Sequence, residues 1–120
     1  MGLDIWFNKV KNKELLYYRK VNFLVDFFAR KLGTEVPNLS GVEVYRDDIE
    51  LLKEYCGEVI KDHSKAKELL PVTTGFFFGS DEYNEYYFED IKQVYEDCDK
   101  LLEEFDNLKD DEHIEFKIWY

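Results

Sequence analysis

The sequence predicts an α+β fold in which three helices pack on a small antiparallel sheet made of the N- and C-terminal strands plus a short middle strand. The chain has 120 residues, the length of a typical domain, so we expect a single domain over residues 1–120. Hydrophobic residues make up 45% of the chain and aromatic residues 18%, which is enough apolar surface for a core. Apolar residues recur every second position near both ends and every third or fourth position between them, which indicates terminal strands flanking helices.

The strands are expected from alternation. Near the start, Leu3, Ile5 and Phe7 fall on one side of an extended chain. Near the end, the apolar positions are Ile114, Phe116, Ile118 and Tyr120. These two segments are the natural candidates to pair with each other, and a short alternation over residues 42–45 predicts a third strand.

The first helix is expected from about Lys13 to Leu32, where Gly33 ends it. The apolar positions that share one face of this helix are Tyr17, Val21, Leu24, Phe28 and Leu32. A second helix is expected to begin at Asp47 or Asp48, since either carboxylate can cap it. Its apolar face consists of Ile49, Leu52, Cys56, Val59 and His63.

The third helix has the most regular pattern in the chain. Ser80 is expected to cap it, after a short helical piece that ends at residues 69–71. Its apolar face consists of Tyr87, Ile91, Val94, Cys98, Leu101, Phe105 and Leu108. Its opposite face consists of Glu85, Glu89, Glu96, Asp99, Glu103 and Asp106. Such separation predicts a strongly amphipathic helix whose acidic side meets solvent.

The net charge of −11 is concentrated in one segment. Residues 1–80 carry 12 acidic and 12 basic residues, whereas residues 81–115 carry 15 acidic residues and three lysines. Direct binding to nucleic acid is disfavoured, because phosphate contacts require a basic surface. A basic protein surface is the favoured partner, and the acidic helix face is the expected contact.

Enzyme signatures are absent from the sequence. No nucleophile elbow, phosphate-binding glycine loop, metal-binding helix motif or Cys-x-x-Cys pair occurs. His63 and His113 are expected to be structural or exposed, and Cys56 and Cys98 to be small buried hydrophobes, with a disulfide or metal pair as the alternative. We therefore predict no catalysis and no cofactor. Neither a membrane span nor a secretion signal is evident, so a cytoplasmic location in a host cell is expected.

A candidate ligand site lies in the first predicted helix, formed by Tyr17, Tyr18, Arg19, Lys20 and Asn22. Helical spacing would place Arg19, Asn22, Asp26 and Arg30 on one stripe. Arginine and asparagine offer planar donors and tyrosine a stacking face, which suits an anionic or nucleotide-like ligand. The alternative is a solvated helix face with an internal Arg–Asp pair.

Two weaker alternatives remain open. The glycine-flanked phenylalanine run at residues 75–80 could bind an anion at a helix start, although the acids that follow it favour a buried strand or turn. Carboxylates at Asp81, Glu82, Glu85 and Glu89 could share a hard cation and serve a small metal-dependent hydrolase. A solvated acidic face explains the same residues without a metal.

Three motifs resemble a group of short proteins encoded by bacteriophages and prophages. They are MGLD at residues 1–4, YRKxN at residues 18–22 and LPxxxGFFFGSxEYxEYY at residues 70–87. The likeness spans most of the chain; members of the group tend to carry Tyr-Trp where this sequence has Tyr17-Tyr18. The resemblance implies a phage origin, and small phage proteins without enzyme motifs are often accessory factors that block a host defence or redirect a host enzyme.

Two forms of that function are expected. In the first, the acidic helix face imitates the charge of a nucleic acid and blocks a basic groove on a host protein. In the second, the cluster around Arg19, Lys20 and Asn22 sequesters a nucleotide-like signal.

Overall fold

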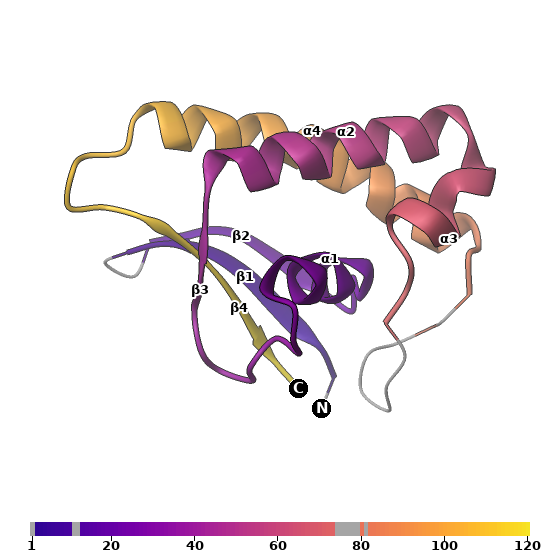
Figure 1. The fold of residues 1–120 in the computed structure, drawn as a ribbon, viewed down its shortest axis with the longest axis horizontal. Coiled ribbons are helices and arrows are strands. Elements are labelled where there is room, and N and C mark those ends of the chain that lie inside the picture. The colour runs from indigo at the N-terminus through magenta and orange to yellow at the C-terminus, as the bar shows by residue number, and fades with distance from the viewer. Residues whose placement is uncertain (1, 11–12, 74–79, 81) are drawn as a thin grey trace.

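The structure is a computed structural model that describes residues 2–10, 13–73, 80 and 82–120. It is an α+β fold with one antiparallel sheet of strand order β2-β1-β4-β3 (Figure 1). The strands are β1 (Asp4–Lys9), β2 (Lys13–Arg19), β3 (Val42–Val44) and β4 (Ile114–Trp119). The helices are α1 (Phe23–Leu32), α2 (Arg46–Lys61), the 3-10 turn η1 (His63–Lys65), α3 (Ala66–Leu69) and α4 (Glu85–Asp106). None of these described helices is long and apolar enough to cross a membrane.

The terminal strands pair with each other, as their alternation predicted. Ile5 lies opposite Ile118 and Phe7 opposite Phe116, so the buried positions of both strands face the same side. The predicted middle strand is also present, because Val42–Val44 pairs with β4 at the edge of the sheet.

The prediction of one helix over residues 13–32 is wrong. Residues 13–19 form β2, which pairs with β1 so that Tyr18 lies opposite Ile5, and α1 begins only at Phe23. Adjacent tyrosines favour an extended strand, and pairing with β2 satisfies a side of β1 that would otherwise be an open edge. Lys20 then takes φ of 60°, a left-handed conformation that cannot continue a helix.

An aromatic cluster joins the sheet to α1. The ring of Phe28 stacks on that of Phe116 with centroids 4.1 Å apart, and Phe7 meets both rings edge-on at 5.9 and 5.3 Å. The residue before Phe28 in α1, Phe27, lies edge-on to Tyr55 of α2, with the two ring centroids 6.3 Å apart. Stacked and edge-on rings add to the stabilisation that apolar burial gives, so this cluster is the centre of the core.

Helices α2 and α4 lie side by side over the same face of the sheet (Figure 1). Their predicted apolar faces are buried at Ile49, Leu52, Cys56, Val59, Tyr87, Ile91, Val94, Cys98 and Leu101. Phe105 and Leu108 are only partly buried, and His63 is exposed, with its ring stacked on Phe88 at 3.7 Å. Cys56 and Cys98 are free thiols. Burial raises the pKa of both, that of Cys98 to about 12, so both are poor nucleophiles.

The helix starts differ from the predicted ones. Asn84, not Ser80, caps α4, and its side-chain oxygen accepts from the backbone N–H groups of Tyr86 and Tyr87, both at 3.1 Å. Ser80 instead accepts from the backbone N–H of Glu82 at 3.1 Å. At α2 the cap position is Tyr45, whose backbone N–H donates to the Asp48 carboxylate at 2.8 Å. Asp48 thus contributes to the helix start from the third helical position.

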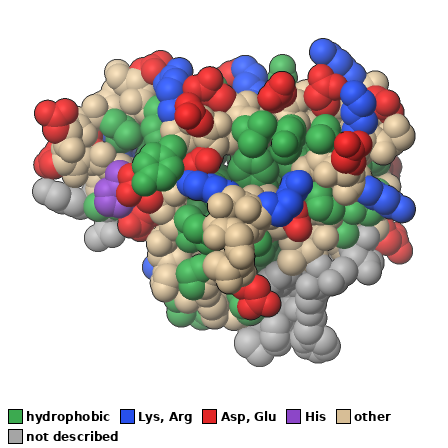
Figure 2. All heavy atoms as spheres, viewed as in Figure 1, with side chains coloured by type: hydrophobic (Ala, Val, Ile, Leu, Met, Phe, Trp, Pro, Cys, Tyr) green, Lys and Arg blue, Asp and Glu red, His purple; other side chains and the backbone are tan. Residues whose placement is uncertain are grey.

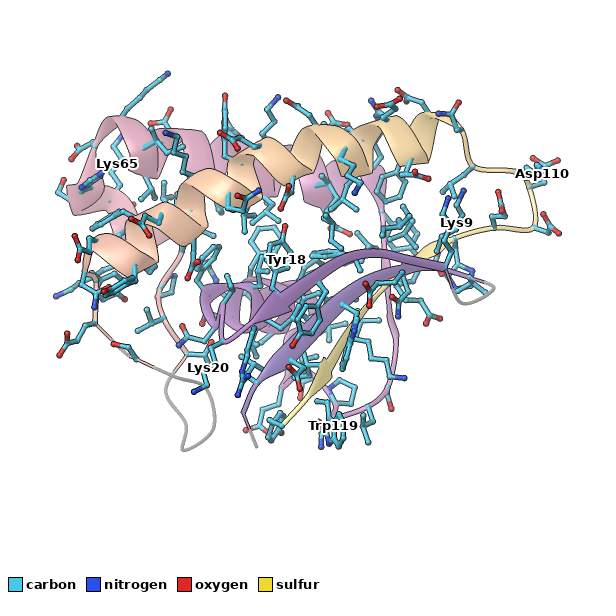
Figure 3. All side chains as sticks on the ribbon, turned by 180° about the vertical axis from the view of Figure 1, so that it is seen from behind. Lys9, Tyr18, Lys20, Lys65, Asp110 and Trp119 are labelled. Carbon is cyan, nitrogen blue, oxygen red and sulfur yellow. The ribbon has the colours of Figure 1, made fainter. Side chains whose placement is uncertain are left out.

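Tyr18 connects the sheet to α4. Its side chain points from β2 toward α4 (Figure 3), and its hydroxyl donates to the Asp97 carboxylate at 2.6 Å. Burial and this hydrogen bond raise the pKa of Tyr18, which keeps the hydroxyl protonated as a donor. Tyr17, the next residue back, points to the opposite side of the sheet and bonds Asp4 in an exposed position.

Replacing Tyr18 with phenylalanine should therefore destabilise the fold by about 1 to 2 kcal/mol, because it removes a partly buried hydrogen bond to a carboxylate. Tyr17→Phe is the matched control and should change the free energy of unfolding by less than about 0.5 kcal/mol, since its bond is exposed. Urea unfolding monitored by circular dichroism gives both values. Equal losses in the two variants would contradict the assignment of residues 13–19 to a strand.

Candidate functional site

The acidic face predicted for the third helix is present as one stripe along α4. We call Glu85, Glu89, Glu96, Asp99, Glu103 and Asp106 the α4 acidic stripe. All six residues are exposed, and a helical advance of about 100° per residue places them within an arc of about 100°. The arc lies opposite the buried face of the helix. The stripe is about 30 Å long, from a rise of about 1.5 Å per residue.

Two carboxylates of the stripe are neutralised by the chain itself. Asp99 pairs with Lys53, and Asp106 pairs with Arg46, both from α2. No lysine or arginine in the described part of the chain forms an ion pair with the other four, which are Glu85, Glu89, Glu96 and Glu103. Lys92 lies within the same arc and offsets part of their charge. The four glutamates therefore carry the available negative charge of the stripe.

The neighbouring surface is mixed in charge. Figure 2 shows acidic and basic side chains interspersed over the helical half of one face. Ion pairs account for much of this pattern on α2, where Arg46 also reaches Glu50 at 3.4 Å and Glu58 accepts from Lys65 at 2.8 Å. Exposed pairs of this kind contribute little to stability, but they remove charge that a partner could otherwise meet.

The predicted ligand cluster is divided between two faces of the sheet. Tyr17 lies on the face away from the helices, with its ring 5.7 Å from that of Trp6. Tyr18 is buried on the other face. The helical stripe expected from Arg19 to Arg30 is wrong, because Arg19 belongs to β2. The ion pair expected within it does form in α1, where Arg30 Nε lies 2.8 Å from Asp26 Oδ2.

Arg19, Lys20 and Asn22 are brought together, at a cavity of about 260 Å³. The cavity lies between the turn after β2 and the start of α4, where Asn84 and Tyr86 line it. Lys20 is at the turn in Figure 3. The cavity is thus lined by the side chains of Arg19 and Lys20, by the capped start of α4 and by Tyr86.

Asn22 holds this turn in place. Its side-chain amide donates to the backbone oxygen of Ser80 at 2.9 Å and accepts from the backbone N–H of Thr73 at 3.3 Å. The Thr73 hydroxyl donates back to the Asn22 carbonyl at 2.8 Å. Asn22 is buried, so its polar groups tie α1 to the segment before α4, as buried amides generally require partners.

The cavity also contains two carboxyl groups, Glu82 and Asp90. Burial, followed by the nearby charge of Glu89, raises the pKa of Asp90 to about 6. Above that pH the ionised Asp90 opposes an anion bound by Arg19 and Lys20.

The metal site considered for Asp81, Glu82, Glu85 and Glu89 is not supported by a cluster. Within residues 2–10, 13–73, 80 and 82–120, no three histidine, cysteine or acidic side chains are grouped so that they could hold a metal ion. Asp81 and the phenylalanine run at residues 75–79 lie outside the described residues. His113 Nε2 lies 3.0 Å from Glu115 Oε1 at the start of β4.

The outer face of the sheet was not selected as a site from the sequence. Trp6, Tyr17 and Trp119 lie on it, beside Lys117, and Trp119 is labelled at the end of β4 in Figure 3. More than half of the Trp119 side chain is exposed, at 54%. The alternation that predicts inward-facing Leu3, Ile5 and Phe7 also predicts that the residues between them face outward. That signal could have identified these exposed rings from the sequence.

Comparison with protein-family models, with curated proteins and with solved structures finds no match. The α4 acidic stripe and the cavity at Arg19 are therefore the two features whose chemistry points to a function.

Proposed function

We propose that this protein is a non-enzymatic inhibitor that binds a basic surface of a partner protein through the α4 acidic stripe. One observation carries the proposal: Glu85, Glu89, Glu96 and Glu103 are exposed along one side of α4 and form no ion pair with a described lysine or arginine. Aligned charges of one sign attract a basic surface over several ångströms and speed its association.

The stripe has a lower charge density than a nucleic acid. The four glutamates that form no ion pair with a described lysine or arginine span about 27 Å and give one charge per about 7 Å, against one per about 1.7 Å of duplex DNA. The stripe imitates the sign and the linear arrangement of phosphates, and attraction by charge needs support from contacts nearby.

The bacteriophage resemblance supports a host protein as the partner. A defence nuclease has a basic groove for its nucleic acid, and an acidic helix lying in that groove would exclude the substrate. Inhibition by occupation requires neither a cofactor nor catalytic residues in this chain.

The stripe can be tested with a charge-matched pair of variants. Glu85→Gln, Glu89→Gln, Glu96→Gln and Glu103→Gln together should weaken binding to immobilised poly-L-lysine about tenfold at low salt, because each exposed contact contributes about 0.2 to 1 kcal/mol. The control combines Glu14→Gln, Glu35→Gln, Glu43→Gln and Glu68→Gln, four exposed positions on other elements. It should change binding by less than about threefold, as read by surface plasmon resonance.

Equal losses in the two variants would show that net charge alone governs binding, and would contradict the stripe. Wild-type binding that does not weaken between low and high salt would contradict the electrostatic mechanism itself.

A second candidate function is sequestration of a nucleotide-like ligand in the cavity lined by Arg19 and Lys20. The observation that favours it is the cavity of about 260 Å³ that Tyr86 lines, a residue that is 68% exposed. Small-molecule sites usually begin at about 300 Å³, so a mononucleotide is the largest ligand to consider. Its phosphate would meet Arg19 and Lys20, and its base would stack on Tyr86.

A cyclic mononucleotide tests this candidate, because its phosphodiester keeps one charge throughout the pH range used. Affinity should rise as pH falls from 7.5 to 5.5, since Asp90, with a pKa of about 6, becomes neutral beside the bound anion. Isothermal titration should show loss of binding in Arg19→Gln and full binding in Arg30→Gln, a control on α1. No heat at either pH, or unchanged affinity in Arg19→Gln, would exclude the cavity as the site.

A further inference from the structure

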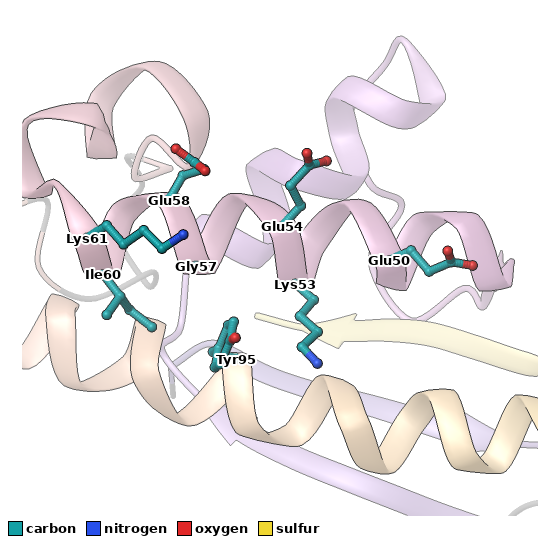
Figure 4. A pocket seen from close by; sticks show the side chains of 8 residues that line it. All are labelled: Glu50, Lys53, Glu54, Gly57, Glu58, Ile60, Lys61 and Tyr95. Atoms are coloured by element: carbon teal, nitrogen blue, oxygen red, sulfur yellow. The ribbon is translucent and has the colours of Figure 1, made fainter.

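A groove of about 430 Å³ runs along α2 where it meets α4 (Figure 4). Tyr95 of α4 forms one wall, and residues of α2 between Glu50 and Lys61 form the rest. The groove opens on the surface that the α4 acidic stripe borders, because Asp99 follows Tyr95 by one turn and pairs across to Lys53 of the lining.

Gly57 shapes this groove. A Cβ atom added at Gly57 would lie 3.2 Å from Cε1 of Tyr95, so the absence of a side chain lets the ring lie against the backbone of α2. Ile60, one turn further, is 41% exposed and adds an apolar patch beside the ring. A helix position with no side chain also allows a partner helix to approach closely.

One cation of the chain already lies over this ring. Lys53 Nζ lies 5.4 Å from the centroid of the Tyr95 ring while it pairs with Asp99. An ammonium group is thus held between an aromatic face and a carboxylate at one end of the groove.

Glu54 is the carboxylate of the lining that is left for a partner. The lining contains three glutamates, of which Glu50 pairs with Arg46 and Glu58 with Lys65. Glu54 is exposed, and no lysine or arginine of the described residues forms an ion pair with it. Lys53 and Lys61 also line the groove, so its net negative charge is small and its selectivity must come from the geometry of Glu54 and Tyr95.

We propose that the groove receives an arginine side chain from a helix of the basic partner, with the aliphatic stem lying against Tyr95 and Gly57 and the guanidinium reaching the Glu54 carboxylate, which points away from α4 in Figure 4. This inference rests on the proposed function, since the α4 acidic stripe brings the basic surface to the groove. Arginine fits better than lysine, because its planar guanidinium bonds a carboxylate with two donors at once.

The probes for this inference are three alanine-based helical peptides that carry arginine, lysine or glutamine at the same spaced positions. Backbone amide shifts of the ¹⁵N-labelled full chain are followed during titration at low salt. The arginine peptide should shift the amides of Glu54, Gly57 and Tyr95 together with those of the stripe, and should bind at least threefold more tightly than the lysine peptide. The glutamine peptide should shift neither set.

Two variants localise the contact. Gly57→Leu fills the groove and should weaken arginine-peptide binding about tenfold. Gly57→Ala leaves most of the space open but requires the Tyr95 ring to give by a few tenths of an ångström, since the added Cβ would lie 3.2 Å from Cε1, so it should weaken binding less than about threefold. Both replacements favour the helix intrinsically, and the unchanged spectrum of α2 and α4 checks their fold. Glu54→Gln keeps the shape of the groove and should lose the preference for arginine over lysine.

Shifts confined to the stripe, with wild-type affinity in Gly57→Leu and Glu54→Gln, would overturn the groove and leave the stripe standing. Equal affinity of the arginine and lysine peptides would overturn the arginine assignment. No shift with either cationic peptide would overturn the groove and the proposed function together.

Discussion

The packing of Phe28 of α1 on Phe7 and Phe116 of the two central strands holds the first helix to the sheet at the centre of the core. It joins the segments from the two ends of the chain to the first helix, and it fixes which face of the sheet is covered. Helix α1 lies on that face, and α2 and α4 cover the same face together with it (Figure 1). Each of these helices then has one buried side and one solvent side, and the solvent side of α4 carries the acidic stripe.

In this arrangement the carboxylates that hold the fold are different from those that we propose for partner binding. The four glutamates of the stripe that form no ion pair with a described lysine or arginine are exposed, so their replacement should leave the fold unchanged, whereas the Asp97 carboxylate on the flank of the same helix accepts a hydrogen bond from Tyr18 of the sheet. Asp99 and Asp106 have another role, because they form ion pairs with basic residues of α2 and so connect the two helices at the surface. One helix thus presents a structural carboxylate, two helix-bridging carboxylates and a set that is available for a partner.

The sequence predicted the elements whose periodicity is undisturbed: the two terminal strands, the middle strand, α2 and the apolar and acidic faces of α4. It failed at residues 13–32, where Tyr17, Val21, Leu24 and Phe28 keep a helical spacing across a strand, a turn and a helix, and the positive φ of Lys20 has no signature in residue type. The ligand cluster predicted on that helix is therefore divided in the structure, because neighbouring strand residues such as Tyr17 and Tyr18 point to opposite faces. The pairing of Asp99 and Asp106 with α2 depends on tertiary contact, and so does the groove at Gly57; neither is visible in local sequence.

From the positions of the exposed glutamates we expect the negative field of this protein to be strongest on the exposed side of α4. Paramagnetic relaxation of backbone amide protons by cationic and anionic nitroxide cosolutes measures that field residue by residue. The cationic cosolute should relax the amides of Glu89, Glu96 and Glu103 several-fold more than the anionic one, with a ratio much closer to one at Tyr17 and Trp119 on the outer face of the sheet. A ratio that is the same on both faces, or a stronger negative field on the outer sheet, would contradict the account.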